Sequence, residues 1–264
     1  MSLWAHGGLR GLAGVLVCAV ALAGAHAAEP AGAAGAEPVA DAVSRTGILK
    51  VAVYNDYFPF SEAKEGGIDV EIAQALADSM GVKLSLLPFD AGESVNDDLR
   101  NMVWKGHYLG YGPADVMMHV PYDHVLAQQN DKVTIFAPYH LESVTLAIND
   151  ERLPDWQGFD VFTHERIAVD GGSFSAQIML GMDGGKYREH VAMGKNIHAA
   201  LDEFASGRAA AIMGMRSELE AGGAAKLPNR LVDFSVPGAP RRSWAVGMSV
   251  KVERTELALS LIHI

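Results

Sequence analysis

The stretch "GGIDVEIAQALADSMGVKLSLLPF", residues 66–89, decides the fold class of this chain. From Ile68 to Met80 an isoleucine, leucine or methionine recurs at every fourth residue, which is the spacing of an amphipathic helix. Gly81 stands where such a helix is expected to end, and the apolar run at residues 82–89 is typical of a strand. The stretch therefore predicts a helix followed directly by a strand.

The same alternation extends outward in both directions. A short β-branched run, "ILKVAV" at residues 48–53, precedes the stretch, and a helix is expected over residues 94–106 after it. Asn196 and Gly207 mark the start and the end of another amphipathic helix. Further strands are predicted at residues 114–120, 166–170, 190–193, 209–215 and 242–250. Strands that alternate with helices predict parallel sheets covered by helices, so we expect an α/β fold.

The length of the chain favours more than one compact unit. At 264 residues it is longer than most single domains. We expect two lobes, each a mostly parallel sheet covered by helices, with residues 48–140 plus 243–258 in lobe 1 and residues 141–242 in lobe 2.

The N-terminus has the pattern of a signal peptide. An apolar run at residues 11–24 follows the single positive Arg10 and ends in "AHA". We expect a signal peptide over residues 1–27 that is cleaved near Ala27, then a flexible linker over residues 28–47. No other stretch approaches membrane-spanning length, so the mature protein is predicted to be periplasmic and not inserted in the membrane.

The C-terminus carries a different signal. The last six residues, "LSLIHI" at 259–264, are what the codons CTG TCT CTT ATA CAC ATC encode, and that string resembles a transposase sequencing adapter. We hypothesise that the natural sequence stops being read after about Ala258 and that the C-terminus is truncated.

The charge balance excludes one class of partner. The chain has 21 Lys and Arg against 32 Asp and Glu, a formal net charge of −11. Such a charge repels phosphate backbones, so nucleic acid is not an expected partner.

The order of these elements resembles the type II periplasmic solute-binding proteins, in particular family 3, which serves polar amino acids. The resemblance is carried by "ILKVAVYNDYFPF", "GGIDVEIAQALADSMGVKL", "RIAVDGGS" and "ALDEFASGRAAAIMG". It implies two lobes with a ligand cleft between them and an ABC permease as the partner.

A second likeness lies in "GYGPADVMMHVP" and "NDKVTIFAPY", which is similar to the MxaJ and XoxJ accessory proteins of methanol dehydrogenases that use pyrroloquinoline quinone (PQQ). This resemblance implies an exported, non-catalytic binding protein without a cofactor. Its partner would be the PQQ-dependent methanol dehydrogenase, with the c-type cytochrome as a further partner. We take this accessory role, docking to or maturing the dehydrogenase, as the leading prediction.

The amino-acid clamp of the solute-binding family is missing from this sequence. In that family an arginine follows the strand that matches residues 114–120, yet no arginine occurs from Asn101 to Glu151. The family's acid lies where this chain has Gly214 and Met215. Losing both partners leaves no buried charge unpaired, which indicates a cleft for an apolar small molecule or for a segment of a protein partner.

Aromatic, thioether and small polar residues are the candidates that replace the clamp. The predicted cleft residues are Tyr54, Asn55, Phe58, Phe60, Met118, His119, Gly172, Ser173, Met215 and Arg216. Thioether and aromatic surfaces adapt to irregular ligands, but methionines in strands also pack in cores. Ser173 is either part of an anion-binding turn or only a helix N-cap. Arg216 either adds a positive group to the cleft or reaches solvent.

The segment "HVPYDH", residues 119–124, raises two further possibilities. Its histidines and Asp123 match no metal-ligand template, so we expect a surface loop and no metal site. On the same fold, His119 and Asp123 would be the acid and base of a periplasmic lyase, which is kept as an alternative without positive support. The other alternative is an ABC-transporter receptor for an apolar or weakly polar solute.

The loop at residues 103–113 is unusually aromatic. Trp104, His107, Tyr108 and Tyr111 either form a contact patch for a partner or pack against their own lobe. No nucleophile motif accompanies these residues, so no catalytic residue is predicted.

Overall fold

The computed structural model describes residues 40–62, 66–226, 228–235 and 243–264. The predicted signal peptide and residues 28–39 of the predicted linker lie outside this part of the chain. Within the described residues, no helix has both the length and the apolar character needed to cross a membrane.

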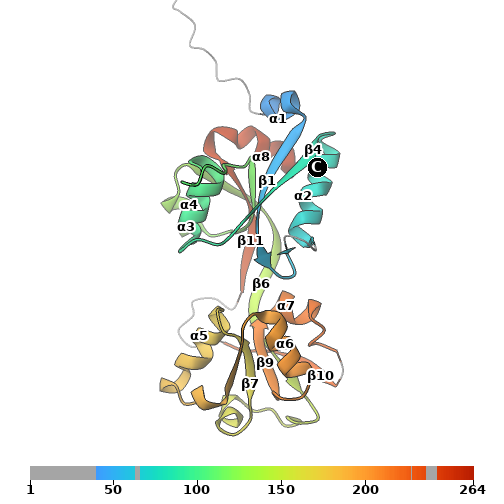
Figure 1. The fold of residues 1–264 in the computed structure, drawn as a ribbon, viewed down its shortest axis with the longest axis vertical. Coiled ribbons are helices and arrows are strands. Elements are labelled where there is room, and N and C mark those ends of the chain that lie inside the picture. Colours follow the sequence, from blue (N-terminus) through green and yellow to red (C-terminus); the bar gives the residue numbers. More distant parts are fainter. Residues whose placement is uncertain (1–39, 63–65, 227, 236–242) are drawn as a thin grey trace, which may run out of the picture. The chain divides into compact units, whose positions relative to one another are not determined.

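One path of hydrogen-bonded strands runs through both lobes (Figure 1). Its order is β4-β1-β5-β11-β6-β9-β7-β8, with β10 beside β6, and β2 pairs with β3 in a separate hairpin. The strands are β1 (Ile48–Tyr54), β2 (Asp56–Tyr57), β3 (Ser61–Glu62), β4 (Lys83–Phe89), β5 (Val116–Pro121), β6 (Val133–Asn149), β7 (Ile167–Asp170), β8 (Val191–Gly194), β9 (Ala211–Met215), β10 (Asn229–Asp233) and β11 (Ser243–Lys251).

Parallel pairing builds the outer part of each lobe. β1 pairs in parallel with β4 and β5, and β7 pairs in parallel with β8 and β9. β6, β10 and β11 add antiparallel pairs in between. This arrangement confirms the predicted α/β fold.

Helices cover both faces of each sheet (Figure 1). They are α1 (Ala40–Thr46), α2 (Ile68–Ser79), α3 (Val95–Leu99), α4 (His124–Gln129), α5 (Phe174–Gly181), α6 (Ile197–Ala205), α7 (Arg216–Ala221) and α8 (Thr255–Ile262). The short helical turns are η1 (Arg100–Trp104, a π-helical turn), η2 (Phe159–Thr163), η3 (Met182–Gly184), η4 (Arg188–His190) and η5 (Val252–Arg254).

In lobe 1 the period-two alternation of the strands divides the core between two faces. Val51 and Val53 of β1 face α1, α2 and α8, whereas Ala52 between them faces α3 and η1. Three residues of the apolar stripe that the sequence predicted for α2 lie against one face of the sheet, Leu76 buried and Ile72 and Met80 partly buried, whereas Ile68 is 41% exposed.

Lobe 2 is built in the same way. Ile167 and Val169 of β7 pack with α5, whereas Ala168 packs with α6 and α7. Leu201 and Phe204 supply the buried face of α6, and Asn196 caps it by accepting the backbone N–H of Ala199 at 3.1 Å.

β6 belongs to both lobes. Its first part pairs with β11, from Val133 to Ser143, and its last part pairs with β9, from Val144 to Ile148. The strand is one element of 17 residues. Side chains in the middle of β6 therefore lie where the two lobes meet.

Part of the linker prediction was wrong. Residues 40–46 form helix α1, and Val43 is buried in the core of lobe 1 beside α8. The Ala/Gly/Pro-rich composition suggested a flexible chain, but one well-placed apolar side chain attaches the segment to the core. At the other end, α8 continues through residues 259–262 with Leu261 buried, and the adapter hypothesis stays a prediction.

Candidate functional site

Two cavities lie on either side of Tyr57 in β2. The Tyr54 cavity, about 430 Å³, is lined by Tyr54, Asn55, Asp56, Tyr57, Asp90, Ala91, Gly92, Glu93, Ser94, Val95, Asp98, His119, Pro121, Trp244 and Val246. The Ser173 cavity, about 300 Å³, is lined by Asp56, Tyr57, Phe58, Asp170, Gly172, Ser173, Phe174, Asn196, Ile197, His198, Met215 and Glu218. Asp56 and Tyr57 belong to both walls, so the two cavities form one candidate cleft.

The topology explains why the cleft is here. Tyr54 and Pro121 are the last residues of β1 and β5, and Asp170 and Met215 are the last residues of β7 and β9. The carboxyl ends of parallel strands are where open α/β sheets bind ligands. Both lobes thus present this edge to the candidate cleft.

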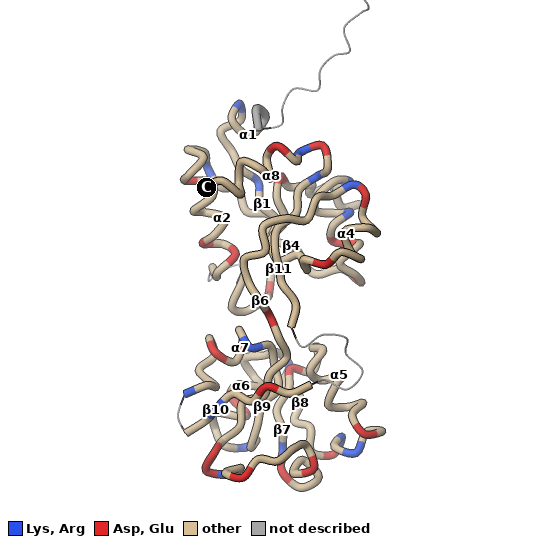
Figure 2. Tube along the Cα trace, turned by 180° about the vertical axis from the view of Figure 1, so that it is seen from behind, with Lys and Arg blue, Asp and Glu red and all other residues tan. Residues whose placement is uncertain are grey.

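The cleft is acidic. The charged residues among its lining are Asp56, Asp90, Glu93, Asp98, Asp170 and Glu218, and the described residues contribute no lysine or arginine to either lining. Figure 2 shows that acidic positions occur in both lobes and not in one alone. Among the described residues, an anion entering the cleft would therefore meet carboxylates and no lysine or arginine.

Asp98 is partly withdrawn from solvent at the Tyr54 cavity. Its carboxylate accepts hydrogen bonds from the Tyr54 hydroxyl at 3.0 Å and from the backbone N–H of Gly92 at 2.8 Å. Burial raises the pKa of Asp98, and the two hydrogen bonds act in the opposite direction. A cation in this cavity would favour the ionised carboxylate.

Glu218 occupies a comparable position at the Ser173 cavity. Its Oε2 accepts the backbone N–H of Met215 at 2.8 Å. Burial, together with the neighbouring carboxylates of Glu142 and Asp170, raises the pKa of Glu218 to about 7, while the hydrogen bond from Met215 acts in the opposite direction. Glu218 is therefore poised to change charge near neutral pH.

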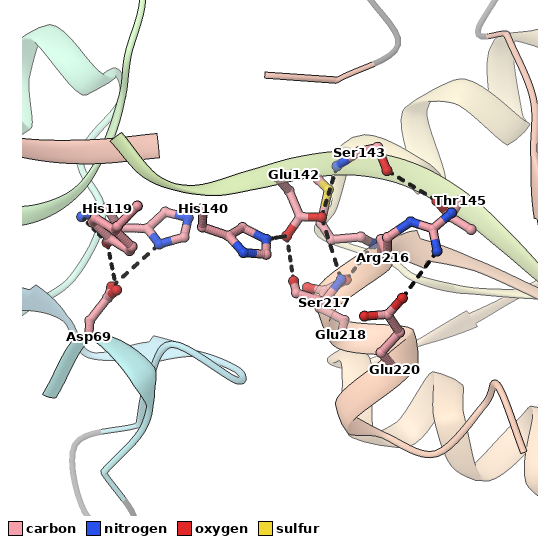
Figure 3. A network of polar contacts seen from close by, with 12 residues as sticks. Asp69, His119, His140, Glu142, Ser143, Thr145, Arg216, Ser217, Glu218 and Glu220 are labelled. Carbon is pink, nitrogen blue, oxygen red and sulfur yellow. Dashed lines mark hydrogen bonds and ion pairs between the residues drawn. The ribbon is translucent and has the colours of Figure 1, made fainter. Parts of the chain in front are cut away.

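A buried polar pair lies behind the Tyr54 cavity (Figure 3). Asp69 of α2 is 0% exposed and His119 of β5 is 5% exposed, and Nδ1 of His119 lies 3.4 Å from Oδ2 of Asp69. This distance is long for a hydrogen bond, but neither atom has another hydrogen-bond partner. The Tyr139 hydroxyl donates to Oδ1 of Asp69 at 2.6 Å and accepts the backbone N–H of His119 at 3.0 Å.

A second buried carboxylate lies on β6 where the lobes meet (Figure 3). Glu142 is 1% exposed and accepts hydrogen bonds from the backbone N–H of Ser143 at 2.8 Å and from both N–H and Oγ–H of Ser217 in α7. His140 lies 3.5 Å from its Oε2. Glu142 thereby connects the crossing strand to the first turn of a lobe 2 helix.

Most of the predicted cleft residues lie on the walls of the two cavities. These are Tyr54, Asn55, Phe58, His119, Gly172, Ser173 and Met215. That they contact a ligand stays a prediction. The ring of Phe58 also lies against the tilted ring of His198, and Nε2 of His198 lies 2.9 Å from Oε1 of Glu62. The imidazole of His198 therefore links the two lobes.

Three predicted cleft residues have other places. Met118 is fully buried in the core of lobe 1, because its position in β5 faces α2 and not the strand end. Phe60 is buried behind the cleft, with its ring against His119 at 4.2 Å and His140 at 5.0 Å. Arg216 forms ion pairs with Glu220 and Asp233 of its own lobe and adds no positive group to the cleft walls.

The Gly-rich turn at residues 171–173 does not offer an anion site. Ser173 Oγ accepts the N–H of Ala176 at 3.3 Å as an N-cap, in agreement with the simpler of the two predictions for this residue. The N–H of Gly172 already donates to Asp170 Oδ1 at 2.9 Å. The carboxylate of Asp170 thus occupies the place that an incoming anion would need.

The aromatic loop divides between its two predicted roles. Trp104 and Tyr111 pack against the core of lobe 1, whereas Tyr108 is 87% exposed. His107 stacks on Tyr111 with ring centroids 4.3 Å apart. Only the tip of the loop is therefore free to contact a partner.

The segment at residues 119–124 forms neither of the sites considered for it. Asp123 caps α4 by accepting the N–H groups of Val125 and Leu126, and His124 begins that helix. The residue that pairs with His119 is Asp69. Across the described part of the chain, no group of three His, Cys, Asp or Glu residues is arranged to hold a metal.

Several polar residues of the site were not predicted, among them Asp69, Tyr57, Asp98, Glu142 and Glu218. Asp69 follows the first residue of the apolar stripe of α2, and an acid inside a predicted core helix is a signal that could have identified it, because buried carboxylates need specific partners. Glu142 is the one acid within the 17 residues of β6, but its segment was not predicted to be a strand, so the sequence carried no such signal for it.

A larger cavity lies in lobe 2. It measures about 820 Å³ and is lined by residues 152–161 together with Asp183 and Tyr187. Two of its polar side chains have partners: Arg152 pairs with Glu165, and the Tyr187 hydroxyl donates to Asp183 at 2.7 Å. It lies away from the strand ends that form the candidate cleft.

Comparisons with known proteins place the fold. No family model matches the chain. A segment of 52 residues is 46% identical to cyclohexadienyl dehydratase of Pseudomonas aeruginosa, and it covers 18% of this chain and 19% of that enzyme. An ancestral cationic amino acid solute binding protein aligns over 84% of this chain and 90% of its own, with a TM-score of 0.62 and 22% identity. An amino acid ABC transporter substrate-binding protein of Streptococcus pneumoniae, bound to L-arginine, aligns over 85% and 89% with a TM-score of 0.56 and 18% identity.

These likenesses show a two-lobed α/β fold of the solute-binding type, which confirms the predicted fold class. The proteins of these two structures are solute-binding proteins by their names, and neither is an accessory protein of a methanol dehydrogenase. The signal peptide and the periplasmic location stay predictions.

Proposed function

We propose that this protein is a solute receptor of the ABC-transporter type, and that its ligand is a small organic cation without a carboxylate group. The proposal assigns the ligand to the cleft formed by the Tyr54 and Ser173 cavities. It replaces the apolar or weakly polar ligand expected from the sequence, because that expectation did not include the acids that line the cleft.

One observation carries the proposal: among the described residues, the charged groups that line both cavities are carboxylates, without a lysine or arginine. A free amino acid would bring its own carboxylate into these walls, and no guanidinium of the described part of the chain lines them to pair with it. A cation finds an opposite charge in either cavity. The overall charge of −11 adds long-range attraction for cations.

Aromatic rings support the same ligand class. Tyr54, Tyr57 and Trp244 line the Tyr54 cavity, and Phe58 and Phe174 line the other. Ring faces attract ammonium groups by about 0.5–2 kcal/mol each, and more strongly when water is excluded. Carboxylates together with aromatic faces are therefore suited to an alkylammonium ligand.

The names of the similar structures agree in part with this ligand class. One is a cationic amino acid binder and another holds L-arginine. We infer that this chain keeps a preference for positive charge, and that the described residues of its cleft offer no lysine or arginine to hold an α-carboxylate.

The accessory role remains a second candidate because of a single feature. The exposed Tyr108 and the neighbouring Leu109, 67% exposed, give the aromatic loop an apolar tip. Exposed aromatic side chains are common anchors in protein interfaces. A lyase activity is supported only by the short similarity to the dehydratase.

Isothermal titration calorimetry tests the proposal. The purified protein is titrated with choline, ethanolamine and L-glutamate, and separately with a PQQ-dependent methanol dehydrogenase. We expect heat from at least one of the two amines and none from glutamate. Binding of glutamate, or silence from both amines, would contradict the proposal, and binding of the dehydrogenase alone would return the accessory role to first place.

A further inference from the structure

His119 is buried beside the Tyr54 cavity, and its Nδ1 has no hydrogen-bond partner other than the long contact of 3.4 Å with Asp69. Nδ1 faces Asp69, and the other nitrogen lies on the far side of the ring (Figure 3). Among the described residues, Nε2 has no hydrogen-bond partner. A polar atom of a side chain that is only 5% exposed is expected to have a partner, and here the cavity that His119 lines is left to supply it.

The hydrogen bonds behind His119 decide which nitrogen carries the proton. The Tyr139 hydroxyl accepts the backbone N–H of His119, so its own proton goes to Asp69 Oδ1. Burial and the charge of Asp69 raise the pKa of Tyr139 far above its ordinary value, so this proton stays in place. Asp69 Oδ2 then has only Nδ1 of His119 to accept from, which puts the imidazole proton on Nδ1. Nε2 is left with a free lone pair.

The backbone at His119 supports a role in binding. This residue has a φ of 58°, a left-handed conformation that is uncommon for a residue other than glycine. The surrounding structure holds the conformation through the N–H bond to Tyr139. Such conformations cluster at binding and catalytic sites, because they direct a side chain where a regular strand would not.

We propose that Nε2 of His119 accepts a hydrogen bond from the ammonium group of the ligand in the Tyr54 cavity, and that Asp69 and Tyr139 are positioning residues that fix this acceptor. The inference rests on the proposed function and narrows the ligand to an amine with at least one N–H. The carboxylate of Asp98 and the rings of Tyr54 and Tyr57 form the rest of the ammonium site.

A comparison of two ligands tests this inference on the unmodified protein. Ethanolamine and choline carry the same hydroxyethyl chain and positive charge, but only ethanolamine has N–H groups. A site made of aromatic rings alone would bind choline, the quaternary ammonium, at least as well as ethanolamine. A lone pair on Nε2 favours ethanolamine, by about tenfold or more for one hydrogen bond to a charged group.

The Asp69→Asn variant tests the positioning. Because the Tyr139 hydroxyl donates to this side chain, the amide oxygen of Asn stays on the Tyr139 side and the amide NH₂ faces Nδ1 of His119. Nδ1 must then accept, the imidazole proton moves to Nε2, and the acceptor for the ammonium is lost. Glu71→Gln, at an exposed position of the same helix, is the matched control.

We expect the preference for ethanolamine to disappear in Asp69→Asn and to persist in Glu71→Gln, with the ¹⁵N signals of the His119 ring reporting the change of tautomer. Equal affinities for the two amines in the unmodified protein, or a preference that survives in Asp69→Asn, would overturn the inference and leave the cation receptor standing. Silence from both amines would overturn the inference together with the proposed function. The ligand comparison and the ¹⁵N spectrum of the unmodified protein decide the question if the variant does not fold.

Discussion

Asp69 and Glu142 are both buried carboxylates at the edge of the cleft, but their surroundings differ. Glu142 accepts from the N–H of Ser143 and from both N–H and Oγ–H of Ser217. Asp69 accepts one hydroxyl at hydrogen-bond distance and otherwise faces an imidazole at 3.4 Å. The number of donors that satisfy a buried acid thus separates a structural carboxylate from one that serves a site.

The difference follows from where each acid lies in the chain. Glu142 is in the strand that both lobes share, and its partner Ser217 belongs to the first turn of α7, so its hydrogen bonds connect two elements that meet there. Asp69 is in the first turn of α2, next to His119, which lines the Tyr54 cavity. We infer that Glu142 stabilises the junction and that Asp69 prepares His119.

The comparison is tested most strongly by removing each carboxylate. Glu142→Ala leaves the donors of Ser143 and Ser217 buried without an acceptor, and we expect it to lower the free energy of unfolding by about 3 kcal/mol. Asp69→Ala leaves the Tyr139 hydroxyl without its acceptor and Nδ1 of His119 without the oxygen that it faces at 3.4 Å, which are fewer and longer contacts than those of Glu142, and should cost about 1 kcal/mol. Urea denaturation of both variants measures the two losses. Equal losses would show that hydrogen-bond satisfaction does not distinguish the two acids.

A third carboxylate, Glu218, gives a prediction on pH. Its pKa in the folded state is about 7, above the ordinary value of 4.5, so between these values the folded protein binds more protons than the unfolded chain. The contribution of Glu218 to stability is therefore complete below about pH 4.5 and is lost as the pH rises through about 7, by about 3 kcal/mol.

Denaturation curves from pH 5 to 8 check this prediction by giving the free energy of unfolding at each pH. In the Glu218→Gln variant, the part of the pH dependence that Glu218 causes should disappear. Because a cation favours ionised Glu218, amine binding should strengthen over the same rise in pH. A binding constant that does not change between pH 6 and 8 would mean that Glu218 does not face the ligand.

The shared wall of the two cavities offers a smaller test. Tyr57→Leu removes the ring that lines both of them, and we expect amine affinity to fall by about 1 kcal/mol, or roughly fivefold. Tyr108→Leu, on the exposed loop tip, is the control and should leave amine affinity unchanged. Calorimetry of both variants decides the matter, and equal affinities would place the cation away from Tyr57.

The smallest effect is expected for Arg216. Its ion pairs with Glu220 and Asp233 lie at the surface, so Arg216→Ala should change the free energy of unfolding by about 0.5 kcal/mol or less. Amine affinity should stay the same within twofold. A marked gain in affinity would indicate that Arg216 repels the ligand and lies closer to the cleft than its ion pairs suggest.

The sequence was sufficient for the fold because its strongest signals are periodic. The stripe from Ile68 to Met80 and the caps of α6 are local patterns, and the structure reproduces them. The sequence did not show that β6 is one strand, because its crossing segment contains Pro138, His140 and Glu142, which have no strand signature of their own. Only pairing with β11 and β9 keeps this segment extended.

The site was predicted less completely, for a physical reason. The missing arginine is visible in the sequence, and so are the aromatic residues after β1. The acids that replace a clamp come from separate elements: Asp98 follows β4, Asp170 ends β7 and Glu218 lies in α7. Their proximity is a product of the fold, so the sequence led to an apolar cleft where the structure has an acidic one.

The central claim is that the cleft accepts positive charge and rejects a carboxylate. The most direct measurement compares the calorimetric affinities of L-arginine and agmatine, its decarboxylated analogue, which carry the same guanidinium group. We predict that agmatine binds more tightly by about tenfold or more, because the cleft walls formed by the described residues hold carboxylates and no lysine or arginine to pair with the α-carboxylate of arginine. Equal or tighter binding of arginine would contradict the account and return this protein to the amino-acid receptors.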